Sequence, residues 1–73
     1  MKYYQRLRDI REDNEKNQTE IAEILKMQQT QYSRYERGER ELPIRHYKTL
    51  ARYYNVSIDF LAGLIDTPRR LHK

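Results

Sequence analysis

Apolar residues recur at helical spacing along the whole 73-residue chain. Spacings of three and four residues place side chains on one face of a helix, whereas a half-buried strand needs strict alternation of apolar and polar residues. No window of the sequence shows sustained alternation, and only two Gly and two Pro interrupt the chain. The sequence therefore predicts an all-α fold, and its length allows one compact domain.

Capping residues divide this helical pattern into five segments. Asn17 and Ser57 are suited to begin helices, because their side chains can accept a hydrogen bond from a first-turn amide. Asn14, Gly38 and Asn55 are suited to end helices, because they tolerate the left-handed conformation of a helix exit. The expected helices, in chain order, cover residues 3–14, 17–25, 29–37, 44–54 and 57–65.

The apolar faces of these helices predict one core. Its expected members are Leu7, Ile10, Ile21, Ala22, Leu25, Tyr32, Tyr35, Leu50, Ala51, Val56 and Leu61. The run from Phe60 to Ile65 carries more apolar residues than one side of a short helix can bury. We therefore expect this run to contribute to an interface between two copies of the chain.

The chain lacks Cys, which excludes disulfides and thiolate metal sites. Stability must then come from the core, and a reducing cytoplasm is the compartment that fits. The first residues have no apolar stretch of signal-peptide length, and the longest apolar run, 60–65, is too short to span a bilayer. We expect a cytoplasmic protein without membrane contact, with one domain over residues 1–66 and a basic tail over 67–73.

Positive charge predominates in the composition. Fifteen Lys and Arg against eleven Asp and Glu give a net charge of +4, and the isoelectric point is near 9.5. Such an excess favours polyanionic partners only when it is concentrated on one surface. The position of the basic residues therefore has to decide the function.

The expected helix over 29–37 carries a polar face suited to recognising bases. Gln29, Thr30, Ser33 and Arg34 share one side of it at about 100° per residue, followed one turn later by Arg37. Gln can pair with adenine, Arg with guanine, and Thr can contact the thymine methyl group. A merely solvated face would more often carry Glu and Lys pairs. A short helix, a tight turn and this second helix form the geometry that places one helix in the major groove.

Four segments together resemble the helix-turn-helix domain of the Cro and phage-repressor family. They are QTEIA at 18–22, YSRYERG at 32–38, LA at 50–51 and NVSIDFL at 55–61. The resemblance extends over about residues 7–63. It implies a compact five-helix fold of the lambda-repressor type, with the helix-turn-helix formed by the second and third helices.

The resemblance also implies residue roles. Base contacts are expected from Gln29, Thr30 and Arg34, with Ser33 as a further candidate. Phosphate contacts are expected from Asn17, Gln18, Gln28, Arg37 and Arg40. Family members tend to pair an Arg of the first helix with a Glu near the end of the third, which here are Arg11 and Glu36.

Three positions depart from the family pattern. Lys26 replaces the usual turn glycine, so we expect a strained positive φ there. Gln28 replaces the Ser or Thr that usually opens the third helix and is a poorer cap. Lys16 replaces the apolar residue before the second helix, so that the hydrophobic staple is lost.

We predict a sequence-specific DNA-binding transcriptional regulator, a repressor that binds a palindromic operator as a homodimer. The alternative is a protein-interaction module of the same fold, an antitoxin or a transcription adaptor, with Tyr3, Tyr4 and Tyr53 as partly exposed interface residues. RNA binding is disfavoured because no aromatic residues interleave with the basic ones. His46 and His72 lie far apart and no acid has an activating partner, so we expect no enzyme, metal, cofactor or small-molecule ligand.

Overall fold

The structure, a computed structural model, describes residues 3–66, in which helices are the only regular secondary structure. The helices are α1 (Gln5–Asp13), α2 (Gln18–Ile24), α3 (Gln29–Glu36), α4 (Ile44–Tyr54) and α5 (Ile58–Leu61). The predicted all-α, five-helix fold is therefore confirmed. The expected tail over 67–73 lies outside the described residues. None of the five helices is both long and apolar enough to cross a membrane.

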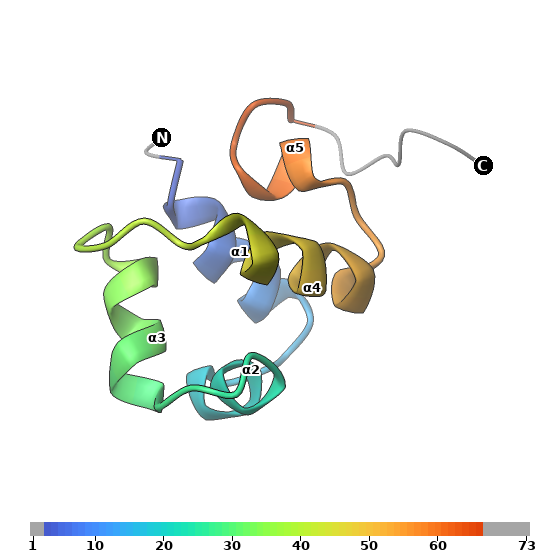
Figure 1. The fold of residues 1–73 in the computed structure, drawn as a ribbon. Coiled ribbons are helices and arrows are strands. Elements are labelled where there is room, and N and C mark those ends of the chain that lie inside the picture. Colours follow the sequence, from blue (N-terminus) through green and yellow to red (C-terminus); the bar gives the residue numbers. More distant parts are fainter. Residues whose placement is uncertain (1–2, 67–73) are drawn as a thin grey trace.

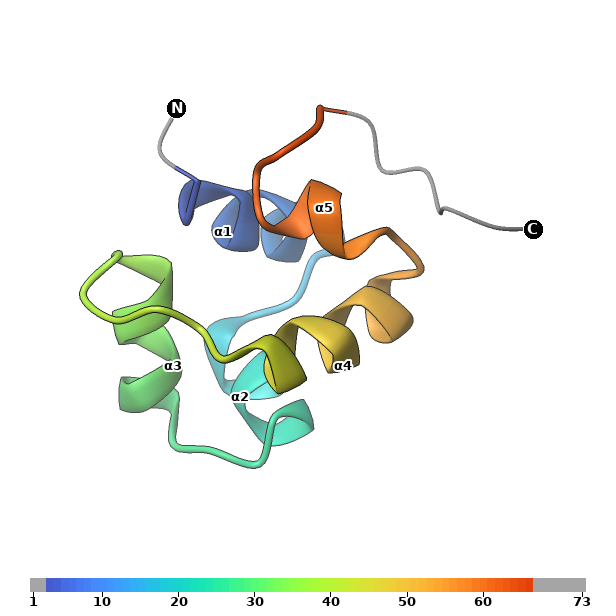
Figure 2. The same ribbon diagram turned by 45° about the horizontal axis from the view of Figure 1, so that its top comes forward.

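The helices surround one core (Figures 1 and 2). α3 packs on α2, α5 packs on both α4 and α1, and α1 also contacts α3. Figure 1 shows α2 nearly along its axis while α3 lies across the view at one side of the molecule. α1 thus links the helix-turn-helix to the C-terminal helices.

The core contains every residue that periodicity assigned to it. Leu7, Ile21, Tyr32, Leu50 and Leu61 are the largest fully buried side chains. Leu42, from the loop before α4, and Tyr47, from α4 itself, are also buried in this cluster. Tyr3, Tyr4 and Tyr53 are partly exposed, as expected.

The helix ends follow the capping residues with one exception. Asn17 and Ser57 accept hydrogen bonds from first-turn amides, and Asn55 has a φ of 61°. α1 ends at Asn14 as expected, but the left-handed conformation expected for Asn14 was wrong: its φ is −96°, and Glu15 has the positive φ of 58°. The Asn14 side-chain Nδ2 instead donates to the Ile10 carbonyl at 2.8 Å. Asn14 therefore closes the last turn, and the exit falls one residue later.

α5 is shorter than expected because the chain turns at Gly63. Gly63 has a φ of 80°, and the Leu64 amide donates back to the Asp59 carbonyl at 2.9 Å. These features close the helix after Leu61, so the chain up to Ile65 is not helical.

The segment after α5 is held by Arg6, which the sequence analysis did not single out. The Arg6 Nη1 donates to the carbonyls of Phe60 at 3.0 Å and Ile65 at 3.1 Å. Its guanidinium lies 4.2 Å from the centre of the Phe60 ring. Arg6 is only 7% exposed, while Leu64 beside these anchors is 74% exposed.

Replacing Leu50 with Ala should destabilise the fold by about 2–5 kcal/mol, because the substitution leaves a cavity in a fully packed site. The matched control is Leu64→Ala, which removes the same atoms from an exposed position and should change stability by less than about 0.5 kcal/mol. Urea denaturation followed by circular dichroism measures both variants. Equal losses for the two variants would contradict the packing described here.

Candidate nucleic-acid interface

α2 begins at Gln18 because a complete capping box fixes its first turn. The Asn17 Oδ1 accepts from the Glu20 amide at 2.8 Å, and the Asn17 amide donates to the Glu20 Oε1 at 2.8 Å. Such a box satisfies two otherwise unpaired amides. It therefore sets where the Gln18 side chain emerges.

The turn between α2 and α3 is tight and uses Lys26 in place of a glycine. Lys26 has a φ of 61°, as the departure from the family pattern predicted. The following Met27 amide donates to the Ala22 carbonyl at 3.0 Å, which closes the end of α2. Gln28 then enters α3 in an extended conformation without a side-chain cap, so its amide group remains exposed.

The outward face of α3 carries the candidate base-contacting residues. Gln29, Thr30 and Arg34 are exposed, and Ser33 is half-buried. The Arg34 side chain forms no hydrogen bond or ion pair within residues 3–66. On the opposite face, Tyr32 and Tyr35 are buried in the core. α3 is thus held by its tyrosines and presents a polar face to solvent.

Arg11 and Glu36 form a buried ion pair between α1 and the end of α3. The Arg11 Nε lies 2.7 Å from the Glu36 Oε2, and the Arg11 Nη2 donates to Oε1 at 3.0 Å. The two side chains are 11% and 3% exposed. Arg11 also donates to the Lys16 carbonyl at 2.9 Å, which ties the chain before α2 to the same guanidinium.

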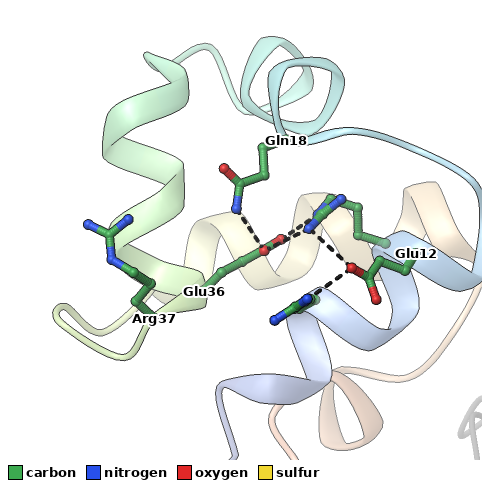
Figure 3. Close-up of a pocket in the computed structure, with 6 residues that line it drawn as sticks. Glu12, Gln18, Glu36 and Arg37 are labelled. Atoms are coloured by element: carbon green, nitrogen blue, oxygen red, sulfur yellow. Dashed lines mark hydrogen bonds and ion pairs between the residues drawn. The ribbon is translucent and has the colours of Figure 1, made fainter.

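Gln18 contacts the Glu36 carboxylate (Figure 3), and Gln29 in turn contacts Gln18. The Gln18 Nε2 donates to the Glu36 Oε1 at 3.0 Å, and the Gln29 Nε2 donates to the Gln18 Oε1 at 2.5 Å. An ionised carboxylate only accepts hydrogen bonds, so the Gln18 amide must turn its NH₂ inward and its oxygen toward Gln29. The relay from Arg11 to Gln29 therefore fixes the orientation of both amides.

Glu36 remains ionised in this setting. Burial by itself would raise the pKa of Glu36, but hydrogen bonds from Arg11 and Gln18 outweigh it and hold the pKa below the ordinary value of 4.5. The same hydrogen bond with Glu36 raises the pKa of Arg11. The pair is charged throughout the neutral range.

A second pair lies at the C-terminal end of α3. The Arg37 Nε donates to the Glu39 Oε2 at 2.9 Å, and the Arg37 Nη1 donates to the Ser33 Oγ. Figure 3 shows the Arg37 guanidinium turned away from the Glu36 carboxylate. Both members of the Arg37–Glu39 pair are about half exposed.

The residues expected to contact phosphates differ in whether their side chains already have partners within the chain. Gln18 belongs to the relay, Asn17 uses its oxygen as a cap, and Arg37 is paired with Glu39. Gln28 and Arg40 are exposed and form no side-chain hydrogen bond within the described part of the chain.

A polar cleft of about 230 Å³ lies where α1, α2 and the end of α3 meet. Arg8 and Glu12 of α1 line it, and the Arg8 Nε donates to the Glu12 Oε2 at 3.0 Å. The sequence analysis did not assign either residue to the site. Their spacing of four residues on one helix was the available signal.

Basic residues outnumber acids in the stretch from the end of α3 through most of α4. Residues 34–52 contain six Lys and Arg against three acids, whereas residues 3–26 contain five against six. Arg45, Lys48 and Arg52 of α4 are exposed, and no acid pairs with them within residues 3–66. The stretch 34–52, which contains the last turn of α3 and most of α4, thus has an excess of basic residues.

The family model described as Helix-turn-helix matches residues 7–61 of the chain. The chain therefore belongs to this helix-turn-helix family, of the Cro and phage-repressor type, and has the lambda-repressor-like fold. This is a family of DNA-binding regulators. No curated protein and no solved structure matches the sequence.

Replacing Arg11 with Met should destabilise the protein by about 3–5 kcal/mol at pH 7, because it leaves the buried Glu36 carboxylate without its cation. Glu36 has a lowered pKa when folded, so its contribution is present above pH 4.5 and is lost as the pH falls through the folded-state pKa. The difference between Arg11→Met and wild type should therefore shrink toward acidic pH. Urea denaturation at pH 7 and pH 4 measures it.

The control for this variant is Arg8→Met, which breaks the Arg8–Glu12 pair, 64% and 52% exposed. An exposed pair of this kind contributes about 0–1 kcal/mol. A loss for Arg11→Met as small as the loss for Arg8→Met would show that the buried pair does not secure α3.

Proposed function

We propose that the chain is a sequence-specific DNA-binding transcriptional regulator, a repressor, that places α3 in the major groove of a palindromic operator. The observation that carries this proposal is the outward face of α3. Gln29, Thr30 and Arg34 are exposed on a helix whose other face is fixed by Tyr32 and Tyr35. Repression needs only occupancy of the DNA, which such a domain can supply by itself.

The relay supports adenine as the partner of Gln29. One Nε2 hydrogen of Gln29 is used by Gln18, which leaves its second hydrogen and its Oε1 free. Adenine offers an acceptor at N7 and a donor at N6 in the major groove, and it matches this pair of groups. Thr30, which is exposed beside Gln29, is suited to a thymine methyl group.

Arg34 and Ser33 complete the proposed base contacts. The guanidinium of Arg34 is exposed near the middle of the face, and guanine offers it two acceptors, O6 and N7. The Ser33 Oγ accepts from Arg37, so its hydroxyl hydrogen remains available for an acceptor on a base edge.

The proposed phosphate contacts flank this face. Gln18 keeps one free Nε2 hydrogen after bonding to Glu36 and can donate it to a phosphate oxygen. Asn17 and Gln28 stand at the starts of α2 and α3, and Arg37 and Arg40 lie beyond the end of α3. Such contacts would fix the position of α3 in the groove without carrying sequence information.

A homodimer on DNA is part of the proposal, because one short helix contacts too few base pairs to be specific. Of the expected interface, Leu61 is fully buried in the core and Phe60 lies under Arg6. Within the run from Phe60 to Ile65, Leu64 is the large apolar side chain that is exposed. Gly63 beside it lies against Tyr3. We propose that Leu64 and Tyr3 meet the second copy.

Replacing Arg34 with Ala should weaken binding to the preferred site by about 1–3 kcal/mol and relax the preference at one base pair, with much less effect on random DNA. Replacing Arg37 with Ala should weaken binding to the preferred site without changing which bases are preferred, and should lower the salt slope on that site by about one, because it removes a phosphate contact. Fluorescence anisotropy titrations across salt compare a duplex selected from a random pool with a scrambled duplex.

Equal losses on selected and scrambled DNA for Arg34→Ala would refute base recognition by this residue. Binding of a protein partner that is unaffected by any change in α3, together with no DNA binding, would support the interaction-module alternative instead.

Sedimentation with a palindromic duplex should show two chains per duplex, and Leu64→Ser should weaken this pairing without changing the fold of the monomer. One wild-type chain per palindrome would contradict the dimer. A monomer in free solution would agree with pairing driven by DNA.

A further inference from the structure

Arg37 is engaged within its own chain at the edge of the proposed interface. Its Nε and Nη2 donate to the two carboxylate oxygens of Glu39 at 2.9 Å and 3.3 Å. Its Nη1 donates to the Ser33 Oγ. Two of the five N–H donors of Arg37 remain free, but Glu39 occupies the Nε and Nη2 edge, which is an edge that can bind a phosphate bidentately. A phosphate can bind this edge only by displacing the Glu39 carboxylate.

The backbone holds Glu39 in this place. Gly38 has a φ of 78°, and the Glu39 amide donates to the Arg34 carbonyl at 3.0 Å. A Cβ at Gly38 would meet the Tyr4 ring, and the positive φ is strained for any other residue, so this turn favours glycine. Glu39 is thus fixed one residue beyond the turn, next to the last turn of α3.

This position is electrostatically unfavourable for an acid in two ways. The C-terminal end of a helix carries partial negative charge, which repels a carboxylate. DNA phosphates along the proposed interface would repel it as well. Arg37 offsets both effects, and its hydrogen bonds to the Glu39 carboxylate lower the pKa of Glu39. Arg34, the proposed guanine contact, also attracts Glu39.

We propose that Glu39 is a specificity-determining residue, because it competes with DNA phosphates for Arg37 and so suppresses binding to DNA that does not fit the site. This inference rests on the proposed function. On a well-fitted operator, α3 brings a phosphate close to Arg37, and the phosphate replaces the carboxylate. On unrelated DNA the docking is looser, and Arg37 stays with Glu39.

The pair is suited to this exchange because it is weak. Arg37 and Glu39 are 55% and 53% exposed. Exposed pairs are screened by solvent and break readily. The buried Arg11–Glu36 pair, in contrast, cannot exchange its partner for a phosphate without leaving a buried charge unpaired.

The test compares Glu39→Gln with Glu41→Gln in the full chain. Glu41 lies in the same exposed loop and forms no ion pair within residues 3–66, so both variants remove one charge from the same region. Anisotropy titrations across salt use a duplex selected from a random pool and a scrambled duplex of equal length. Glu39→Gln should bind the scrambled duplex about two- to fivefold more tightly than wild type.

Its salt slope on the scrambled duplex should also rise by about one, because Arg37 gains a phosphate there. The slope on the selected duplex should stay unchanged, and Glu41→Gln should change affinity by less than about twofold, since screening limits its reach. In an Arg37→Ala background, Glu39→Gln should have no further effect. These results together support the exchange of partners at Arg37.

Equal effects of Glu39→Gln and Glu41→Gln, an unchanged slope on scrambled DNA, or an effect that persists without Arg37 would overturn this inference while leaving DNA binding intact. Absence of DNA binding by the wild-type chain would overturn the proposed function and the inference with it. Thermal unfolding of each variant checks that the exposed substitutions leave the fold unchanged.

Discussion

The arrangement of the helix-turn-helix depends on a carboxylate that is buried against a guanidinium. Removing a carboxylate from water is costly unless an opposite charge and further hydrogen bonds compensate. Glu36 obtains both from Arg11 and Gln18, which lie on two other helices. The hydrogen bonds to this one carboxylate therefore tie α1, α2 and α3 to one another. The same contact thereby orients Gln29 on the outer face of α3.

The end of α3 combines this fixed pair with an exchangeable one. Glu36 is almost fully buried, whereas Glu39, three residues later, is half exposed. Burial makes the Arg11–Glu36 pair costly to break, and exposure makes the Arg37–Glu39 pair easy to break. A DNA-binding surface benefits from one strong and one weak pair. The proposed recognition helix has to be held rigidly, while the cations that flank it have to be free to exchange their partners for phosphates.

Helical periodicity was sufficient to predict the fold and the core, because apolar spacing and capping depend on local sequence. It misplaced the left-handed residue after α1, because the identity of Asn14 could not show that its side-chain amide would bond to the preceding turn. It also missed Arg6, whose carbonyl partners lie more than fifty residues away. The Arg11–Glu36 pair came from family resemblance. The Arg37–Glu39 pair was missed because side chains two residues apart meet only when the chain turns, as it does at Gly38.

The most direct test of this account is selection of bound sequences from a random DNA pool by the wild-type chain and by Gln29→Ala. The account predicts an enriched inverted repeat, with half-sites centred about one helical turn apart, for the wild type. Gln29→Ala should lose the preference for adenine at one symmetric position and keep the rest of the repeat. A pool without any enriched sequence, or the same repeat with an unchanged adenine preference in Gln29→Ala, would contradict base recognition by α3.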